Sequence, residues 1–214
     1  MTTSKRHTGS SKQYALRITV PAILCVLLFA GMIFIYILRF IEQRLMEQKR
    51  NLTRETTELV FDTLQFYERR VEIGDIDREE AQALAIEQIR HFRYGPAVKD
   101  YFWINDLTPT MIMHPYRSDL EGQNISTFTD PTGQRVFVTF VRTIRKHGAG
   151  FVDYMWQWED DPNRIVPKIS YVRLFEPWGW IVGTGSYVED VRSEIASMTR
   201  DLVIVCSAIL GIIL

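Results

Sequence analysis

The chain has 214 residues, 46% of them hydrophobic, and a formal net charge of −1. This length allows one or two domains. Residues 39–201 carry all 26 acidic residues but only 21 of the 25 basic ones, which gives this segment a net charge of −5. A segment with this charge lacks the basic surface that nucleic-acid binding requires, so we expect no nucleic-acid partner.

Residues 18–38 form a run of 21 residues without a charged side chain. At 1.5 Å per residue, a helix of this length crosses a hydrocarbon core of about 30 Å. The run is too long for a signal peptide and no small-residue cleavage pattern follows it, so we predict a retained transmembrane helix. Residues 1–17 hold four basic residues and no acid. This predicts a cytoplasmic N-terminus and an extracytoplasmic segment 39–201, which in a bacterial inner membrane would be periplasmic.

A second uncharged run, residues 202–214, ends the chain after 13 residues. Because 13 residues are too few to span a bilayer, we expect this run to be the start of a second transmembrane helix that continues beyond Leu214. The two cysteines, Cys25 and Cys206, both lie in the apolar runs. The segment between these runs can therefore form no disulfide of its own.

The helical pattern continues past the first run to about Ile73. One stripe of side chains recurs there at spacings of seven and four, which is typical of an amphipathic helix: Leu45, Leu52, Leu59, Thr63, Tyr67 and Val71. The stripe either packs against its own domain or pairs with a second subunit in a homodimer. A second helix is predicted for residues 78–92, because Asp77 is a favourable N-cap residue and Glu80 follows it at capping-box spacing.

Five strands are expected from side-chain alternation and turn residues, at residues 99–106, 110–114, 151–158, 166–175 and 178–185. Residues 115–130 have the composition of a loop, and Asp130-Pro131 predicts the start of a helix that ends near Lys146. Strands joined by short turns, with helices to the side, indicate an α+β fold with an antiparallel sheet.

The sequence shows no set of residues typical of catalysis. It contains no nucleophile elbow, no His-Glu-X-X-His pair and no glycine-rich phosphate loop. The four histidines are scattered, and no cysteine is available outside the apolar runs. We therefore predict no enzyme activity, no metal site and no cofactor.

Lys168 is the polar residue that is hardest to reconcile with a strand core. It shares a strand face with Val166, Ser170 and Val172. Burying a cation without a counter-charge is very unfavourable, and a small carboxylate ligand would supply that charge. The alternative is that Lys168 lies on an edge strand, where it blocks aggregation or pairs with a nearby acid.

Four further positions could join Lys168. His114 ends the second predicted strand, and its ring can donate to a carboxylate through either nitrogen. Tyr101 and Trp103 share a face, and Tyr171 offers a hydroxyl. Aromatic walls with a few donors describe a small-ligand pocket, but they also describe an ordinary core.

Six motifs occur in a fixed order: Tyr-Phe-Trp-Ile-Asn-Asp (101–106), Met-His-Pro (113–115), Leu-Glu-Gly-Gln-Asn (120–124), Gly-Ala-Gly-Phe-Val-Asp-Tyr-Met-Trp (148–156), Pro-Lys-Ile-Ser-Tyr-Val (167–172) and Pro-Trp-Gly-Trp-Ile-Val-Gly-Thr-Gly (177–185). Together they resemble the single-Cache extracytoplasmic sensor domains of bacterial chemoreceptors, sensor histidine kinases and diguanylate cyclases. The resemblance covers about residues 40–200.

The resemblance implies a PAS-like five-stranded sheet, a long membrane-emergent helix, and in many members recognition of a small organic acid such as acetate, propionate or pyruvate. A cytoplasmic output module usually follows the second span. Carried over by motif, the ligand-binding residues are Tyr101, Trp103, Met113, His114, Pro115, Lys168 and Tyr171. In this assignment Lys168 is the counter-ion of the carboxylate, and Tyr101, His114 and Tyr171 are donors. Lys168 and Tyr171 face opposite ways in a regular strand, so both reach one ligand only if the strand bends.

Two other interpretations remain open at this point. The domain could sense a different ligand, such as an amine or a partner protein, or it could be a ligand-free membrane-anchored scaffold. If the domain is a sensor, whether of a carboxylate or of another ligand, we expect binding to shift the last strand, and with it the helix that begins at Val188.

Overall fold

The structure is a computed structural model that describes residues 9–95 and 97–213. These residues form two units, one of residues 46–189 and one made of residues up to 45 together with those from 190 onward. Each unit is considered by itself below.

The second of these units contains the apolar helices. Helical structure is continuous through α1 (Gly9–Met32), a π-helical turn (Ile33–Ile37) and α2 (Leu38–Glu72), and α5 spans Val188–Ile213. The helical stretch from Arg17 has an 18-residue window of mean hydropathy 2.7, and the helix from Val188 has one of 1.7. By length and composition, both are candidates for crossing a membrane.

A five-stranded antiparallel sheet forms the centre of residues 46–189, as the sequence predicts. Its strand order is β2-β1-β5-β4-β3. The strands are β1 (Phe102–Asp106), β2 (Met111–Met113), β3 (Ala149–Trp158), β4 (Asp161–Phe175) and β5 (Trp180–Tyr187). β4 begins five residues before its predicted start, because the β3–β4 turn closes at residues 159–160. β5 continues two residues past its predicted end, to Tyr187.

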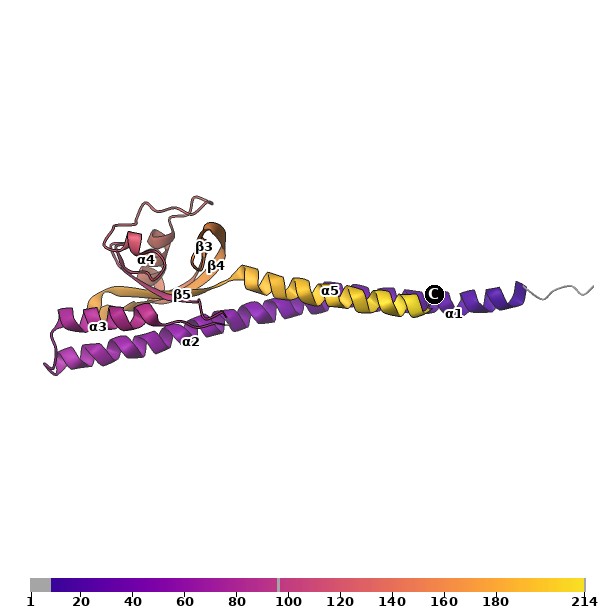
Figure 1. The fold of residues 1–214 in the computed structure, drawn as a ribbon, viewed down its shortest axis with the longest axis horizontal. Coiled ribbons are helices and arrows are strands. Elements are labelled where there is room, and N and C mark those ends of the chain that lie inside the picture. Colours follow the sequence, from indigo (N-terminus) through magenta and orange to yellow (C-terminus); the bar gives the residue numbers. More distant parts are fainter. Residues whose placement is uncertain (1–8, 96, 214) are drawn as a thin grey trace, which may run out of the picture. The chain divides into compact units, whose positions relative to one another are not determined.

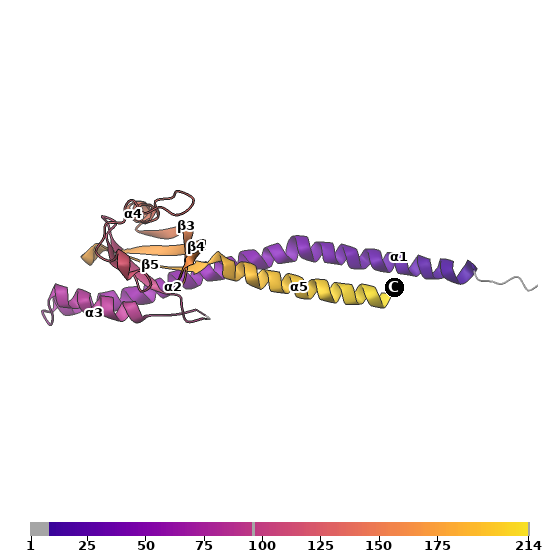
Figure 2. The ribbon, with the colours of Figure 1, turned by 45° about the horizontal axis from the view of Figure 1, so that its top comes forward.

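Helices cover both faces of the sheet. Figures 1 and 2 show α4 (Val136–His147) on one face and α2 with α3 (Arg78–His91) on the other. On the α4 side, Phe137 and Phe140 pack against Trp103, Tyr154 and Trp156. This cluster surrounds the predicted site.

The opposite cluster is formed by α2, α3 and the other face of β1 and β5. Its core includes Leu64, Ile89, Phe102 and Val182. The Asp77 carboxylate accepts a hydrogen bond from the Glu80 backbone N–H at 2.8 Å, so the predicted N-cap of α3 is confirmed.

The predicted start of α4 at Asp130-Pro131 is wrong, because α4 begins at Val136. The Asp130 carboxylate accepts hydrogen bonds from the backbone N–H groups of Thr132 (2.9 Å) and Gln134 (3.0 Å), which closes a turn instead of capping a helix. Its second oxygen accepts from the Met155 backbone N–H at 2.9 Å. The carboxylate therefore ties this turn to β3.

The side chains of α2 that face the sheet also differ from the predicted stripe. Within the part of α2 that belongs to residues 46–189, the buried face consists of Thr53, Thr57, Val60, Phe61, Leu64 and Glu68. Leu59, which the sequence pattern placed on the packing stripe, is 65% exposed. Leu59 therefore does not belong to the face of α2 that packs against the domain itself.

Candidate functional site

Lys168 lies in the interior of the sheet, because β4 is hydrogen-bonded to β5 on one side and to β3 on the other. The edge-strand alternative is therefore wrong. The Lys168 side chain is only 1% exposed, although it carries an amine. The Lys168 side chain points to the α4 side of the sheet. Ser170 and Val172 share its strand face, and Ser170 hydrogen-bonds the Tyr154 hydroxyl at 3.0 Å while Val172 belongs to the core on the α4 side.

The Lys168 amine is surrounded by aromatic rings. Its Nζ lies 4.0 Å from the centre of the Tyr101 ring, 4.7 Å from that of Tyr187 and 5.9 Å from that of Trp103. Within the described residues, its one hydrogen bond is a long contact of 3.5 Å to the Tyr187 hydroxyl. Burial lowers the pKa of Lys168 to about 7, while the negative charges of Asp100 and Glu159 oppose this shift. Aromatic faces stabilise a cation, but they do not replace a counter-ion.

His114 is the second polar group of the site and is buried at the end of β2. Its ring centre lies 4.8 Å from that of Tyr101. Burial lowers the pKa of His114 well below its usual value, and the positive charges of Lys168 and Arg117 lower it further. Its Nδ1 accepts a hydrogen bond from the Tyr116 backbone N–H at 3.2 Å. The neutral ring therefore carries its hydrogen on Nε2, which makes Nε2 a donor.

Two more donors lie unused in the same cluster. The Tyr101 hydroxyl and the Trp156 indole N–H are buried and find no hydrogen-bond partner among the residues described. Burial strongly raises the pKa of Tyr101, so its hydroxyl stays protonated. A buried donor without an acceptor is costly, and such groups often mark a binding site.

The donors adjoin a narrow void between aromatic side chains, which has no room for a water-sized sphere in this conformation. Its walls are aromatic, and all its lining residues are buried: Tyr101, Trp103, His114, Phe137, Phe140, Tyr154 and Trp156. Lys168 is not among them and lies over the Tyr101 ring. A ligand therefore reaches the amine only when these aromatic side chains move.

The floor of the site is a pair of glycines on β5. A Cβ on Gly183 would overlap the Trp103 indole, and one on Gly185 would overlap Ser170 and approach Lys168 Cε. Both glycines lie in a regular strand, and neither has a positive φ. The missing Cβ atoms let the Trp103 and Lys168 side chains lie close to the sheet.

Tyr187 is the residue of the site that sequence reasoning missed. Its hydroxyl donates to the Gln157 carbonyl at 2.9 Å and accepts from the Glu159 backbone N–H at 2.7 Å. It also accepts the long hydrogen bond from Lys168. Continuing the alternation of Gly183 and Gly185 by two residues would have placed Tyr187 on the same face. It is the last residue of β5, and α5 starts at the next residue.

Four of the seven sequence-derived positions come together: Tyr101, Trp103, His114 and Lys168. Met113 belongs to the core on the α2 side of the sheet. The Tyr171 ring packs 4.9 Å from that of Phe151, and Phe151 in turn contacts Arg50 of α2.

Met113 and Tyr171 therefore face away from Lys168, as the strand period requires when no bend intervenes. Pro115 follows His114 and is half-buried, but it does not line the void.

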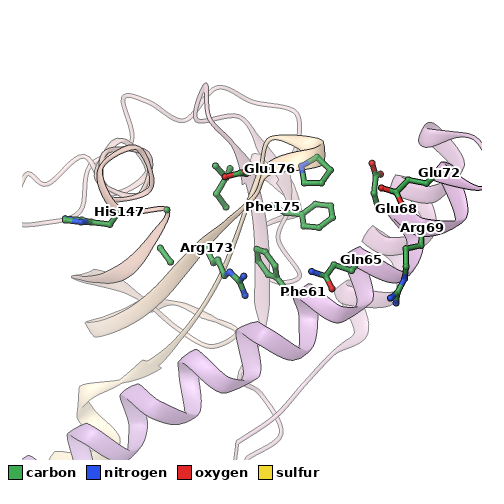
Figure 3. Close-up of a pocket in the computed structure, with 13 residues that line it drawn as sticks. Phe61, Gln65, Glu68, Arg69, Glu72, His147, Arg173, Phe175 and Glu176 are labelled. Carbon is green, nitrogen blue, oxygen red and sulfur yellow. The ribbon is translucent and has the colours of Figure 1, made fainter.

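A larger cleft of about 560 Å³ lies between α2 and the end of the sheet where β4 and α4 finish (Figure 3). Two of its charged side chains, Glu68 and Arg173, are paired with residues beside the cleft. Glu68 accepts hydrogen bonds from Arg78 at 3.3 Å and from the Trp178 indole, and Arg173 pairs with Glu58. Unlike the Lys168 site, this cleft offers no buried charge without an ion-pair partner.

Comparison with known proteins places the chain in a family. Residues 45–201 match the family model described as single Cache domain 2. The chain is 42% identical to the methyl-accepting chemotaxis protein McpP of Pseudomonas putida, over 77% of this chain and 30% of that protein. It is 31% identical to the sensor histidine kinase MctS of Rhizobium johnstonii, over 73% of this chain and 32% of that protein. The match spans about a third of the length of these curated relatives.

A solved structure supports the same assignment. It is described in terms of carboxylic acid recognition by a Cache chemosensory domain. Its sequence is 44% identical to this chain, and its fold superposes with a TM-score of 0.64. The superposition covers 68% of this chain and 97% of that one.

Proposed function

Because the chain belongs to the single Cache domain 2 family, we propose that it is a membrane-anchored extracytoplasmic sensor that binds a short-chain carboxylate. The observation that carries this proposal is the excess of donors around Lys168. Three donors converge in one cluster: the buried Lys168 amine, which makes one long hydrogen bond, and the Tyr101 hydroxyl and Trp156 indole N–H, which have no partner among the described residues. A carboxylate supplies both the negative charge and the acceptor oxygens.

The tight packing around the void supports a ligand of only a few carbon atoms. The void is walled by aromatic rings and holds no water-sized sphere in this conformation, so only a short apolar tail would fit once these rings move. In the proposed complex, the carboxylate contacts Lys168 Nζ, the Tyr101 hydroxyl and the His114 Nε2–H. Trp103 and Phe140 enclose the tail. Carboxylic acid recognition described for the similar Cache domain is consistent with this ligand class.

The proposed signal starts at the contact between Lys168 and Tyr187. A carboxylate draws the amine toward itself and away from the Tyr187 hydroxyl, which the structure holds at 3.5 Å. Tyr187 immediately precedes α5, one of the two candidate membrane helices. A ligand shifts this equilibrium only by the difference in its affinity for the two states, so the contacts of Lys168 must differ between them.

We place the N-terminus in the cytoplasm and the Cache domain in the periplasm, on the charge asymmetry of the flanking segments. A cytoplasmic output module after the second span would receive the signal. The relatives include a chemotaxis receptor and a sensor histidine kinase, and the choice between such outputs depends on sequence beyond the sensor domain.

We also propose that the sensor acts as a homodimer through α2. Leu52, Leu59, Phe66 and Ile73 recur every seven residues, and all four are exposed, with Leu59 at 65% and Ile73 at 78%. This stripe supplies one apolar residue in every heptad, which is half of the two-position seam of a coiled coil. The buried face of the same helix uses other residues, which leaves this stripe available for a second copy.

Isothermal titration calorimetry of the whole chain in lipid nanodiscs, with a series of two- to four-carbon carboxylates, tests the binding proposal. We expect saturable one-site binding of at least one acid. Lys168→Met should weaken it by about 30-fold or more, because removing one partner of a buried charge pair costs about 2–5 kcal/mol. Lys146→Met is the matched control, because Lys146 is exposed at the end of α4.

Absence of binding by every acid contradicts the carboxylate proposal. It would favour a different ligand, which an unbiased thermal-shift screen can identify, or a ligand-free scaffold. Equal affinity of the wild type and Lys168→Met would show that the acids bind away from the proposed site.

A further inference from the structure

The void beside Lys168 is closed off from solvent, so a ligand needs a route into it. Every residue that lines the void is buried, and the most exposed of them, Tyr154, is only 7% exposed. An aromatic wall of this kind opens only if a side chain moves. The question is which side chain separates the void from a space that is open to solvent.

Trp156 is the residue that lines both the void and an outer pocket of about 320 Å³. The outer pocket lies between β3, the beginning of β4 and the loop before α4, and its other walls include Phe128, Pro131 and Ile165. Ile165 is 42% exposed, so this pocket opens to solvent. The cleft along α2 in Figure 3 and the groove beside α3 share no lining residue with the void.

The contacts of Trp156 allow its indole to move. The indole packs against four rings, with centres 5.3 Å away for Phe128, 5.7 Å for His114, 5.7 Å for Phe137 and 6.0 Å for Tyr154. Its N–H has no hydrogen-bond partner among the described residues. Phe128, on its outer side, is only partly buried. A rotation of the indole toward the outer pocket would therefore break no hydrogen bond.

We propose that the outer pocket is the entrance to the ligand site and that rotation of the Trp156 indole opens the passage between them. This inference rests on the proposed carboxylate site. Arg117, which lines the entrance, is paired with Asp119 at 2.7 Å. Asp130 is the other charged residue of the entrance, and its carboxylate accepts hydrogen bonds from the backbone N–H groups of Thr132, Gln134 and Met155. Because both charges are engaged, the width of the entrance rather than its charge sets the rate of passage.

A passage has a kinetic signature that a binding contact lacks. Narrowing a passage slows association and dissociation by the same factor, and the dissociation constant stays the same. Removing a contact in the site mainly raises the dissociation rate. Stopped-flow fluorescence with the tightest-binding acid, on the whole chain in nanodiscs, measures both rates.

Ile165→Trp narrows the entrance at a residue that does not itself line the inner void. We expect both rate constants to fall by about tenfold or more, with less than about a twofold change in the dissociation constant. Leu84→Trp is the control, because Leu84 is 39% exposed on α3 and lines neither space. Its rates should equal those of the wild type.

A thiol-labelling variant tests the same point on protein that is already folded. The chain has only two cysteines, Cys25 and Cys206. With both changed to serine, Ile165→Cys carries a single thiol at the entrance. A bulky disulfide-forming label should slow ligand binding and release, and reduction of the label should restore both rates.

Unchanged rates in Ile165→Trp and in the labelled protein contradict this route. A weakened dissociation constant with an unchanged association rate also contradicts it, because the outer pocket would then be part of the binding site. A wild-type protein that binds no carboxylate contradicts the proposed function itself, which is a separate result.

Discussion

The Lys168 amine lies 3.5 Å from the Tyr187 hydroxyl, and the two residues face each other across the β4–β5 pair. Lys168 is buried among aromatic rings, whereas Tyr187 ends the strand that leads into α5. This contact joins the proposed ligand site to the start of a candidate membrane helix.

Carboxylate binding should take up a proton at alkaline pH. The pKa of Lys168 is about 7 without ligand, so its amine is largely neutral at pH 8.5. A bound carboxylate favours the charged amine, which raises this pKa. Calorimetry in two buffers of different ionisation enthalpy should therefore give close to one proton taken up at pH 8.5 and little at pH 6. Equal uptake at both pH values would contradict a Lys168 counter-ion.

The affinity for the carboxylate should depend on pH through the protonation of Lys168 as well. It should be highest at pH 7 and below, where Lys168 is already charged, and should fall by up to about tenfold per pH unit above pH 7. Lys168→Arg should abolish this dependence, since an arginine stays charged throughout the range. Persistence of the pH dependence in Lys168→Arg would assign it to another group.

Lys168→Met should stabilise the ligand-free protein while it removes binding. The buried amine lacks an ion-pair partner within the described residues, and a methionine of similar length avoids its desolvation cost. We expect the free energy of unfolding to rise by about 1–4 kcal/mol at pH 6. Thermal melts of the ligand-free protein measure this gain, and a lower melting temperature than in the wild type would show that Lys168 is structurally satisfied.

The stability gain of Lys168→Met over the wild type should shrink as the pH rises. The folded pKa of Lys168, about 7, lies below the value of about 10.4 in an unfolded chain, so the unfolded state holds more protons between these two values. The stability of the wild type therefore increases with pH in this window. The difference in melting temperature between Lys168→Met and the wild type should be largest below pH 7 and smaller at pH 9.

Tyr187→Phe should separate binding from signalling. It removes the hydroxyl that contacts Lys168, Gln157 and Glu159, but it keeps the ring beside the amine. In the wild type, ligand should change backbone hydrogen exchange in the first turns of α5, and in Tyr187→Phe this change should be lost although ligand still binds.

Tyr171→Phe serves as the control, because Tyr171 lies on the other face of the sheet. Equal ligand-induced exchange in Tyr187→Phe and the wild type would exclude the proposed coupling.

Leu59→Glu should weaken self-association. A charge at the centre of the exposed heptad stripe would face its symmetry mate in a parallel pair, which is unfavourable. Sedimentation equilibrium of the whole chain in detergent should show a dimer for the wild type and mainly monomer for the variant. Leu84→Glu on α3, where the leucine is 39% exposed, is the matched control. A monomeric wild type, or a dimer unaffected by Leu59→Glu, would contradict the dimer proposal.

Strand alternation predicted much of this fold. It gave five strands in antiparallel arrangement, and it placed Tyr101 with Trp103 and Lys168 with Ser170 on shared faces. It could not give the strand order, which depends on pairing between distant segments. The interior position of β4, which excludes the edge-strand interpretation of Lys168, was therefore visible only in the structure.

The errors have physical causes. Met113 and Tyr171 were included because they are adjacent to His114 and Lys168 in motifs, although the two-residue period of a strand turns them to the other face. The sequence pattern assigns no role to Gly183 and Gly185, whereas their missing side chains make room for Trp103 and Lys168. Tyr187 was left outside the last strand because the predicted strand ended at Gly185.

A crystal structure of the protein with its tightest-binding short-chain acid tests the central proposal most directly. We predict one carboxylate oxygen within hydrogen-bond distance of Lys168 Nζ. The Tyr101 hydroxyl or the His114 Nε2–H should also contact the carboxylate, and the Lys168 amine should have moved away from the Tyr187 hydroxyl. An acid bound elsewhere, for instance in the cleft of Figure 3, with Lys168 still beside Tyr187, would contradict it.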